Sequence, residues 1–511
     1  MTAAPRATLR SLDSLSSQRF RNAWLRNPRV ELLSGLVVAL ALIPEAISFS
    51  IIAGVDPKVG LYASFSIAII ISMTGGRMGM ISAATGAMAL VVVPLVADHG
   101  IGFLFAATIL AGAMQILFGA LGVGALMRFI PRTVMLGFVN ALAILIFLAQ
   151  VPHILLSGEG ADQSQFGMNL LFIVIGLVII YGLPRLTTVI PSPLVAIVVL
   201  AVAATVFDLR LPTVGDMGDL PSSLPIPGLP DVPFSFDTLR IVLPFAITLA
   251  LVGLLESLLT AQLLDDLTDS DSDKNVESRG QGIANVATGF LGGMAGCAMI
   301  GQSMINHRTG GRTRLSTLAS GVFLLILVMV LGDFVAQIPM GALVAVMIMV
   351  SIGTFNWASV RPSTLRVEPR PEIVVMLVTV GITVLTHNLA YGVGAGVVLS
   401  AVFFVRHVSH VVNVMSVVDP DHVERLYDVS GELFFASSND FVHAFDYDAV
   451  DARRVEIDLS NARVWDTSAV VALDTVVDKF AQRGITAELV GLDERGARLL
   501  RETGGRTSPT H

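Results

Sequence analysis

Two carboxylates lie inside apolar segments that are long enough to cross a membrane. They are Glu45 and Glu256, and each is followed about one helical turn later by a hydroxyl, Ser48 or Thr260. A charge inside a membrane helix costs free energy, so an acid at such a position indicates a functional site, such as a site for a coupling ion. A helix-capping or packing role is the alternative for each acid.

Two other apolar segments begin after runs of small residues. One starts at Thr85-Gly86-Ala87, and the other follows the run Gly292–Ala298, with Ser303 close to its start. A helix that begins inside the membrane presents unpaired N–H groups and a partial positive charge. Two such ends facing each other can bind a carboxylate, bicarbonate or oxyanion without an arginine. Close helix packing is the alternative reason for the small residues.

The composition indicates a polytopic membrane protein, because 54% of the residues are hydrophobic, 14% are charged and the mean hydropathy is +0.76. The net charge of −8 does not favour nucleic acid as a partner. The single cysteine, Cys297, excludes a disulfide framework and a cysteine-based metal cluster. We find no nucleophile, base and orienting group at a spacing that predicts an enzyme.

The apolar segments predict fourteen membrane spans within residues 30–416, seven in each half. A proline-rich linker at 208–237 separates repeat one (30–207) from repeat two (238–416). It is predicted to be an external loop. The predicted spans are 30–53, 59–75, 84–98, 101–124, 129–150, 169–183, 188–207, 238–262, 279–296, 299–307, 313–332, 335–352, 371–387 and 389–416.

The distribution of arginines predicts the orientation of these spans. The N-terminal segment 1–29 is rich in arginine, which places it in the cytoplasm, and fourteen spans return the C-terminus to the same side. Because seven is odd, the second set of spans runs opposite to the first, as an inverted repeat requires. The acidic run Asp265–Asp273 lies on a predicted inner loop, and the sequence assigns no function to it.

Several separated motifs resemble one family. Ile43-Pro44-Glu45-Ala46-Ile47-Ser48, followed by Gly60-Leu61-Tyr62-Ala63-Ser64, is similar to the first-helix signature of SulP-type anion permeases, the solute carrier family that includes sulfate permeases. Gly280–Asn285 and Gly310–Arg314 are similar to its second-half signatures. The resemblance covers nearly the whole chain.

This resemblance implies a core domain, made of helices 1–4 and 8–11, that moves against a gate domain of helices 5–7 and 12–14. It also implies a homodimer. The family's anion site lies between the third and tenth helices. The matching residues are Thr85, Gly86, Ala87, Ile300, Gly301, Gln302 and Ser303. Some members have a basic residue where this chain has Gln302. The net charge of the pocket is therefore not fixed by the resemblance, and both anion exchange and symport remain alternatives.

The resemblance also concerns the coupling ion. Glu256 resembles the acidic position of sodium-coupled relatives, in which Thr260 and a carbonyl near Gly296 would complete a sodium site. A proton is the other candidate, because burial favours the neutral form of a carboxylic acid. We favour a proton, since Glu45 and Glu256 are both available and the sequence shows no cluster of oxygen ligands. No other cofactor is expected.

The composition changes after the last predicted span, and residues 419–500 are soluble in character. Alternating strands and helices predict a small α/β domain, and Asp458-Leu459-Ser460 with Val464–Ala469 resembles the STAS fold, which implies a possible cytoplasmic protein partner. The loop before its helix contains Thr467 and Ser468, which are interpreted as a helix N-cap, with a phosphorylation switch as the alternative. The tail 501–511 is predicted to be disordered.

The sequence therefore predicts an all-α membrane domain of fourteen spans with a small α/β STAS domain, located in the inner (plasma) membrane. The predicted function is proton-coupled symport of a small anion such as the dicarboxylate fumarate, by an elevator-like movement. Sodium-coupled transport of bicarbonate or sulfate, and anion exchange, remain alternatives. A channel-like or sensory membrane protein that signals through its STAS domain is the alternative outside secondary transport.

Overall fold

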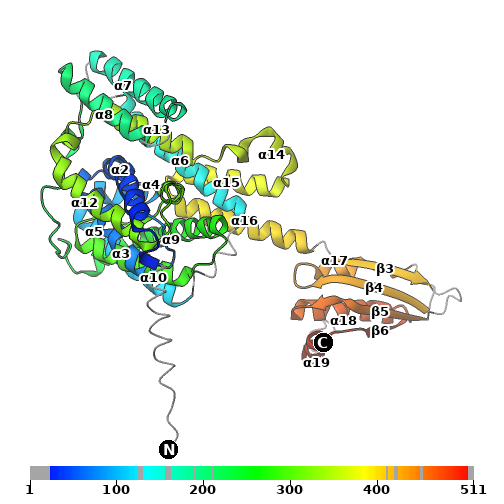
Figure 1. The fold of residues 1–511 in the computed structure, drawn as a ribbon. Helices are drawn as coiled ribbons and strands as arrows, with labels where there is room; N and C mark the ends of the chain where they lie inside the picture. Colours follow the sequence, from blue (N-terminus) through cyan, green and yellow to red (C-terminus); the bar gives the residue numbers. More distant parts are fainter. Residues whose placement is uncertain are drawn as a thin grey trace, which may run out of the picture. The chain divides into compact units, whose positions relative to one another are not determined.

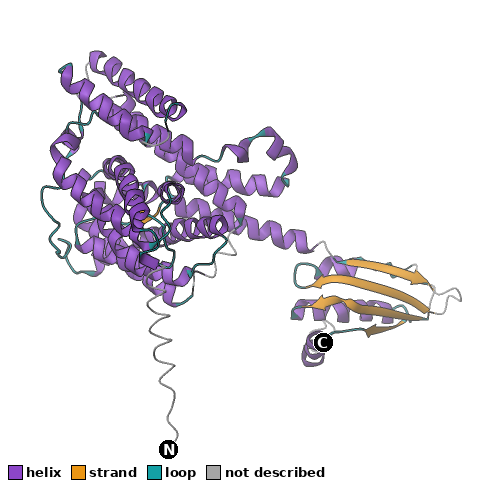
Figure 2. Cartoon of the chain, in the orientation of Figure 1, coloured by secondary structure: helices purple, strands orange, loops and turns teal. Residues whose placement is uncertain are grey.

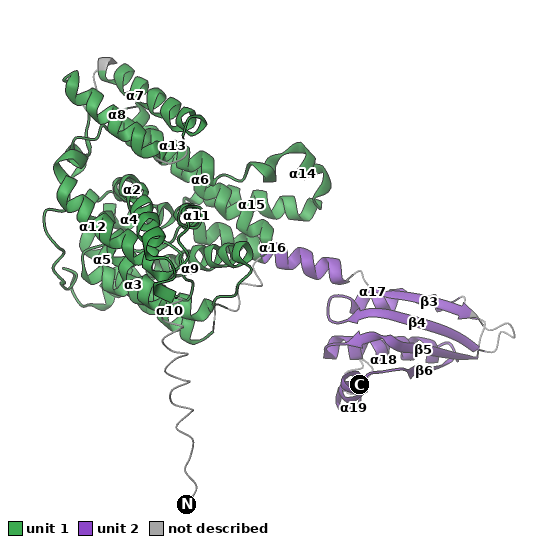
Figure 3. Ribbon diagram, viewed as in Figure 1, with its two compact units in different colours: residues 1–397 green, residues 398–511 purple. Residues whose placement is uncertain are grey.

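The computed structural model describes residues 23–122, 124, 131–155, 163–187, 191–209, 211–409, 412–418, 424–448, 450 and 453–503. It divides into two compact units, residues 1–397 and 398–511 (Figure 3). The first unit is built of apolar helices, and the second contains a sheet of four strands (Figure 2). We describe each unit by itself.

Within the described residues, the first half of the membrane unit contains seven α-helices at the places of the seven predicted spans (Figure 1). The third of them, α4, follows a three-residue strand, β1 (Ser82–Ala84), so the chain crosses this region as an extended segment and then a helix. The helices are α2 (Pro28–Ala53), α3 (Pro57–Thr74), α4 (Gly86–His99), α5 (Ile101–Ala120), α6 (Arg132–Leu155), α7 (Gln163–Gly182) and α8 (Ser192–Val206).

The second half repeats this order and adds one short helix, α14. Its third membrane helix, α11, again follows a three-residue strand, β2 (Gly296–Ala298). The helices are α9 (Phe236–Thr268), α10 (Lys274–Phe290), α11 (Ile300–Thr309), α12 (Arg314–Ala336), α13 (Met340–Thr354), α14 (Pro362–Val367), α15 (Arg370–Thr386) and α16 (Leu389–Ser409).

Length and hydropathy by themselves identify fewer spans. Among the described residues, eight helices are long and apolar enough to cross a membrane, and α4, α8 and α13 are shorter apolar helices. The other three predicted spans correspond to α10, α11 and α15. Helix α10 buries polar residues against its neighbours, and α11 has only 10 residues and follows the three-residue strand β2. The repeat, and not hydropathy, therefore identifies these helices.

The membrane helices form the predicted core and gate domains. Helices α2–α5 pack with α9–α12, whereas α6–α8 pack with α13, and α15 packs on α6. The glycines Gly392 and Gly396 of α16 lie against Thr379 of α15, so α16 belongs with the gate. Within the core, α2 packs on α11 and α4 packs on α9, which crosses the two repeats.

Close helix contacts in the core depend on glycine. A Cβ on Gly112 of α5 would lie 2.6 Å from the carbonyl oxygen of Gly282 in α10, and a Cβ on Gly282 would lie 2.5 Å from that of Gly112. The two backbones therefore touch at this crossing, as expected when small residues bring membrane helices together.

The linker between the repeats is ordered where the structure describes it. Thr213 and Asp216 form a capping box at the start of a short 3-10 helix, and Thr213 pairs with Pro339. The linker also contacts repeat one, because the Tyr62 hydroxyl donates to the carbonyl of Ser223.

The C-terminal unit is an α/β domain with strand order β3-β4-β5-β6. The pair β3–β4 is antiparallel, and the pairs β4–β5 and β5–β6 are parallel. The elements are β3 (Asn413–Val418), β4 (Glu424–Leu433), α17 (Ser438–His443), β5 (Arg454–Val464), α18 (Thr467–Ala481), β6 (Thr486–Val490) and α19 (Glu494–Thr503).

Three details of this region differ from the sequence interpretation. The last span was expected to reach residue 416, but α16 ends at Ser409 and residues 413–418 pair with β4 as a strand. The N-cap of α18 is Asp466, whose carboxylate accepts from the N–H of Ala469 at 3.0 Å, so neither Thr467 nor Ser468 is the cap. Helix α19 continues to Thr503 inside the predicted tail, and residues 504–511 lie outside the described part.

We expect Gly112→Val to destabilise the membrane unit. The added side chain would overlap the backbone of α10 and force the two helices apart, at a cost of about 1–3 kcal/mol. Thermal unfolding of the detergent-solubilised protein, followed by size-exclusion chromatography, measures the effect as a lower midpoint. The control is Gly353→Val, because a Cβ at Gly353 meets nothing within 4 Å. Equal midpoints for the two variants would contradict the proposed backbone contact.

Candidate functional site

A pair of short strands lies at the centre of the core. Strands β1 and β2 are antiparallel, with Ala83 paired to Cys297, Ser82 to Ala298 and Ala84 to Gly296. All six residues are buried. The register is symmetric about the central pair, so the extended segments of the two repeats meet as equivalent elements.

Each strand leads directly into the N-terminus of a helix. Thr85 caps α4, and its side-chain oxygen accepts from the N–H of Met88 at 3.5 Å. Met299 is the N-cap residue of α11 and has no side-chain cap. Because the strands are antiparallel, the two helices start at opposite ends of the pair, separated by four residue steps or roughly 13 Å along the strands. Both starts direct first-turn N–H groups and the positive end of a helix dipole into the core.

The two helix starts differ in exposure. Ile300, the first residue of α11, is 40% exposed, and a Cβ at Gly301 would meet nothing within 4 Å. At the start of α4, by contrast, Ala87 is fully buried and a Cβ at Gly86 would lie 3.0 Å from the ring of Phe49. The start of α11 is therefore open in this conformation, whereas the start of α4 is covered.

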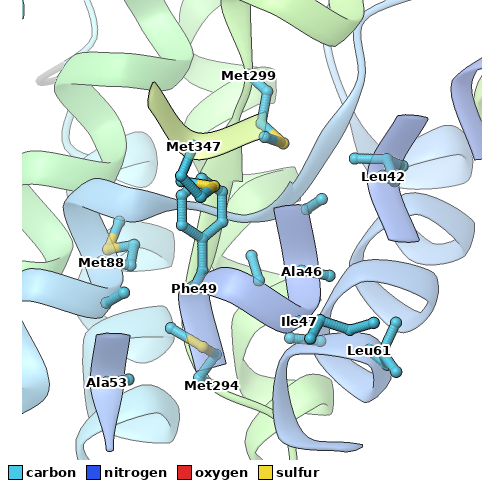
Figure 4. Close-up of a cluster of buried hydrophobic side chains, with 14 of the residues drawn as sticks. Leu42, Ala46, Ile47, Phe49, Ala53, Leu61, Met88, Met294, Met299 and Met347 are labelled. Carbon is cyan, nitrogen blue, oxygen red and sulfur yellow. The ribbon is translucent and has the colours of Figure 1, made fainter. Parts of the chain in front are cut away.

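Apolar side chains provide the cover over α4. Phe49 of α2 lies among Met88, Met299 and Met347 in the buried cluster that Figure 4 shows. Met347 belongs to α13, so the gate contributes to this cluster together with the core. Ile146 of α6 also faces Gly86. The boundary between core and gate next to α4 is therefore apolar.

Glu45 lies beside the second helix start. Its carboxylate accepts a hydrogen bond from the side-chain amide of Gln302 in α11, and both residues are buried. The predicted coupling acid of repeat one thus contacts a predicted anion-site residue of repeat two. Ser48 does not join them, because its hydroxyl donates to the carbonyl of Pro44 within its own helix.

Glu256 lies beside the strand pair and the first helix start. It is partly buried, accepts a hydrogen bond from the Cys297 thiol and lies near the Thr85 hydroxyl. The Thr85 oxygen lies 3.2 Å from Cys297 Sγ. The acid of repeat two thus contacts an anion-site residue of repeat one.

Thr260 and Gly296, which the family resemblance assigns to a sodium site, make hydrogen bonds to other groups. The Thr260 hydroxyl donates to the carbonyl of Glu256, not to its carboxylate. The carbonyl of Gly296 accepts from the side-chain amides of Gln281 and Asn285, at 2.9 and 3.0 Å, which occupies both of its lone pairs. Within the described residues, no group of three or more His, Cys, Asp or Glu side chains is suited to a metal.

Ser303 contacts the segment that leads into β1. It is fully buried, and its hydroxyl oxygen accepts from the N–H of Ile81 at 3.0 Å. This residue of α11 therefore binds the approach to the opposite strand.

The sequence interpretation missed the residues that hold β2 in place. Asn285 of α10 accepts from the N–H of Gly296 at 3.0 Å and donates to Gln115 of α5 at 2.8 Å. Ser257 accepts from the N–H of Ala298 at 3.1 Å. The motif Gly280–Asn285 contains the signal, since buried amides at 281 and 285 lie one turn apart on one face of a helix.

Comparisons with known proteins agree with this architecture. The model of the sulfate permease family matches residues 29–379, and the STAS domain model matches residues 414–508. The chain belongs to the sulfate permease family. It is thus a multi-pass membrane protein of a family of anion transporters, with a C-terminal STAS domain, as the motifs predicted.

Among its relatives, the chain is 56% identical to "Putative sulfate transporter YbaR" of Bacillus subtilis, over 95% of this chain and 99% of the relative. It is 28% identical to "Bicarbonate transporter BicA" of a Picosynechococcus strain, over 78% of this chain and 75% of the relative.

Two solved structures share the fold. The transmembrane domain of a cyanobacterial BicA has a TM-score of 0.63 at 26% identity, covering 73% of this chain and 98% of that chain. The murine Solute Carrier 26 family member A9 transporter in the inward-facing state has a TM-score of 0.81 at 16% identity, covering 99% of this chain and 92% of that chain. The second likeness concerns the fold alone.

We expect Ile300→Pro to weaken anion binding without breaking α11. Proline removes the N–H at the first helical position, where helices tolerate it, and the extended backbone of Met299 suits a residue before proline. A hydrogen bond to a charged group contributes about 1.5–3 kcal/mol, so the apparent KM for the anion should rise about tenfold or more.

The matched control is Ile300→Ala, which removes the side chain and keeps the N–H. Uptake into proteoliposomes over a range of anion concentrations measures both variants. If Ile300→Ala raises the KM as much as Ile300→Pro does, the side chain and not the backbone N–H accounts for the effect, and the prediction is wrong.

Proposed function

We propose that this protein is a proton-coupled symporter of a small carboxylate or oxyanion. The observation that carries the proposal is the crossed arrangement of the core, in which each intramembrane acid contacts a residue at the interrupted helix of the opposite repeat. An anion held at the helix starts would then lie close to acids whose charge changes when they take up a proton.

The direction of coupling follows from charge. An ionised Glu45 or Glu256 repels an anion at the neighbouring helix start, and a protonated one does not. A proton and an anion therefore favour each other's binding, and the two can cross the membrane together. The gradient that moves protons into the cell would then drive the anion inward.

The neutral side chain of Gln302 supports this proposal. Without a basic residue here, the positive potential comes from the two helix ends, each with roughly half a charge. The ionised Glu45 beside Gln302 offsets that potential, so proton uptake by Glu45 would make the site attractive to an anion. Glu45 would thus be a second acid involved in coupling, next to Glu256.

Movement of the core against the gate would carry the loaded site across the membrane. The buried polar contacts described around the strand pair are within the core, and its contact with the gate near α4 is apolar, through Phe49, Ile146 and Met347. An apolar boundary can slide without breaking hydrogen bonds, which suits rigid-body movement of one helical domain past another.

Sodium coupling is the second candidate. A relative is named as a bicarbonate transporter, and Glu256 occupies the place that the family resemblance assigns to an ion-coupling acid. The hydrogen bonds support a proton, because the Gly296 carbonyl already accepts from two amides.

Several broader properties belong to the same proposal. The substrate is one of fumarate, which the sequence analysis favours, and sulfate or bicarbonate, which the names of relatives suggest. We further propose a homodimer in the plasma membrane, with the STAS domain in the cytoplasm and available to a protein partner. Thr467 is exposed and Ser468 is partly buried, so Thr467 is the more accessible of the two hydroxyls for phosphorylation.

Uptake into proteoliposomes tests the proposal. Radiolabelled fumarate, bicarbonate and sulfate are offered in turn under an imposed proton gradient and then under a sodium gradient. We expect uphill accumulation of at least one anion with the proton gradient alone. Accumulation that requires sodium would contradict proton coupling, and flux that never exceeds equilibrium would indicate a channel.

Glu256→Gln should abolish the uphill accumulation while anion binding stays measurable. The amide keeps the shape of the side chain but cannot gain or lose a proton. The matched control is Asp266→Asn, the same chemical change at an exposed acid further along α9, which should leave accumulation unchanged. Undiminished uphill uptake by Glu256→Gln would remove Glu256 from the coupling role.

A further inference from the structure

Cys297 joins the coupling acid to the first helix start. It is the single cysteine of the sequence, it is fully buried, and it is the middle residue of β2, paired with Ala83. Its thiol donates to the carboxylate of Glu256, and its sulfur lies 3.2 Å from the hydroxyl oxygen of Thr85. One side chain therefore contacts both the acid of α9 and the N-cap residue of α4.

The two repeats differ at this position. Ala83 occupies the equivalent place in β1, and its methyl group neither donates nor accepts hydrogen bonds. Glu45 is instead bonded by the amide of Gln302, which has fixed donors. A thiol can donate and accept, so the contact at Glu256 can change direction when the acid changes its charge.

The hydrogen bonds around Cys297 form a chain with two possible directions. When Glu256 is ionised it can only accept, so the thiol donates to it and the sulfur accepts from the Thr85 hydroxyl. The Thr85 oxygen accepts from the Met88 N–H at the same time. The hydroxyl proton of Thr85 is then directed to the sulfur and is not available to an anion at the start of α4.

Protonation of Glu256 reverses this chain. The new carboxyl O–H donates to the sulfur, the S–H turns towards the Thr85 oxygen, and the Thr85 hydroxyl proton is released. One proton is added, at the Glu256 carboxyl, and the other two protons stay on their own atoms and only rotate. When movement of the core uncovers the start of α4, the released hydroxyl can donate to an anion at the neighbouring N–H groups of Gly86 and Ala87.

We propose that Cys297 is a positioning residue that links proton loading of Glu256 to anion binding through the Thr85 hydroxyl. The inference rests on the proposed function, since it takes Glu256 as a coupling acid. In the described part of the chain, Glu256 is the charged group that acts on the thiol, and Thr85 is its other polar partner. The nearby side chains of α10 and α5, Asn285 and Gln115, are neutral amides bonded to each other.

The test compares Cys297→Ala with Cys297→Ser. The measured quantity is the apparent KM in proteoliposomes at acidic and at alkaline pH, for whichever of fumarate, bicarbonate and sulfate the wild type accumulates best. Wild type should bind the anion about tenfold more tightly at acidic pH, within the usual range of coupling between sites. Cys297→Ala should lose the part of this pH dependence that the Thr85 hydroxyl contributes and keep the part due to charge repulsion, so its ratio of KM values should be smaller than in wild type. Cys297→Ser should keep the full dependence, because a hydroxyl also donates and accepts.

The two variants also separate the inference from the proposed function. If Glu256→Gln abolishes proton-driven uptake but Cys297→Ala keeps the full pH dependence of KM, the role of Cys297 is wrong and proton coupling stands. If Glu256→Gln accumulates the anion like wild type, the role of Glu256 in the proposed function is wrong, and the inference that rests on it is wrong as well. If both cysteine variants lose the pH dependence equally, the site needs the sulfur for its shape, and the relay is overturned.

Infrared spectroscopy of the wild-type protein is a second test, and it does not depend on whether a cysteine variant folds. Because the sequence has one cysteine, the S–H stretching band in the infrared spectrum arises from Cys297 alone. The band should shift on acidification in wild type, as the thiol changes its acceptor from a carboxylate to a hydroxyl. The band of Glu256→Gln should stay in place over the same pH range. A wild-type band that does not move would overturn the inference.

Discussion

The structure depends on one constraint: two helices are interrupted inside an apolar core, where every backbone N–H and C=O needs a partner. The strand pair β1–β2 meets much of that need, since each interrupted segment supplies hydrogen bonds to the other. Gly296 makes the close approach possible, because a Cβ there would lie 2.1 Å from the carbonyl oxygen of Ala83. The first-turn N–H groups of α4 and α11 lie next to the pair and are the natural place for an anion.

Polar side chains from neighbouring helices form hydrogen bonds with the strand pair, and these buried contacts make the interior of the core polar. Asn285 and Ser257 bind the backbone of β2, and Ser64 accepts from the N–H of Ala84 at 3.3 Å. Away from the strand pair, buried carboxylates form hydrogen bonds between the two repeats. Glu31 of α2 accepts from the N–H groups of Arg312 and Thr313, and Glu277 of α10 accepts from those of Gly76 and Arg77. These contacts cross between repeats, so they hold the core together as one body.

The sequence predicted the elements of this arrangement better than their contacts. The lengths of the apolar stretches and the repeat located the described membrane helices, and the small residues around Thr85 and Gly296 indicated both interruptions. The exchange of partners, Glu45 with Gln302 and Glu256 with Thr85, could not be read from spacing, because it depends on how the repeats cross in space.

Two further residues show the same limit. Asp265 belongs to an acidic run to which the sequence assigned no role, yet it is buried in ion pairs with Arg77 and Lys274. Asp466 caps α18 one residue before the predicted cap, and such shifts at helix ends are beyond the reach of a propensity argument.

A density map of the protein with a bound heavy-atom anion tests the central claim most directly. Selenate in place of sulfate, or bromofumarate in place of fumarate, can be located without ambiguity. The account predicts density between the starts of α4 and α11, within hydrogen-bond distance of the N–H groups at Gly86–Ala87 or Ile300–Gly301. An anion that binds elsewhere, with both helix starts left without a ligand, would contradict it.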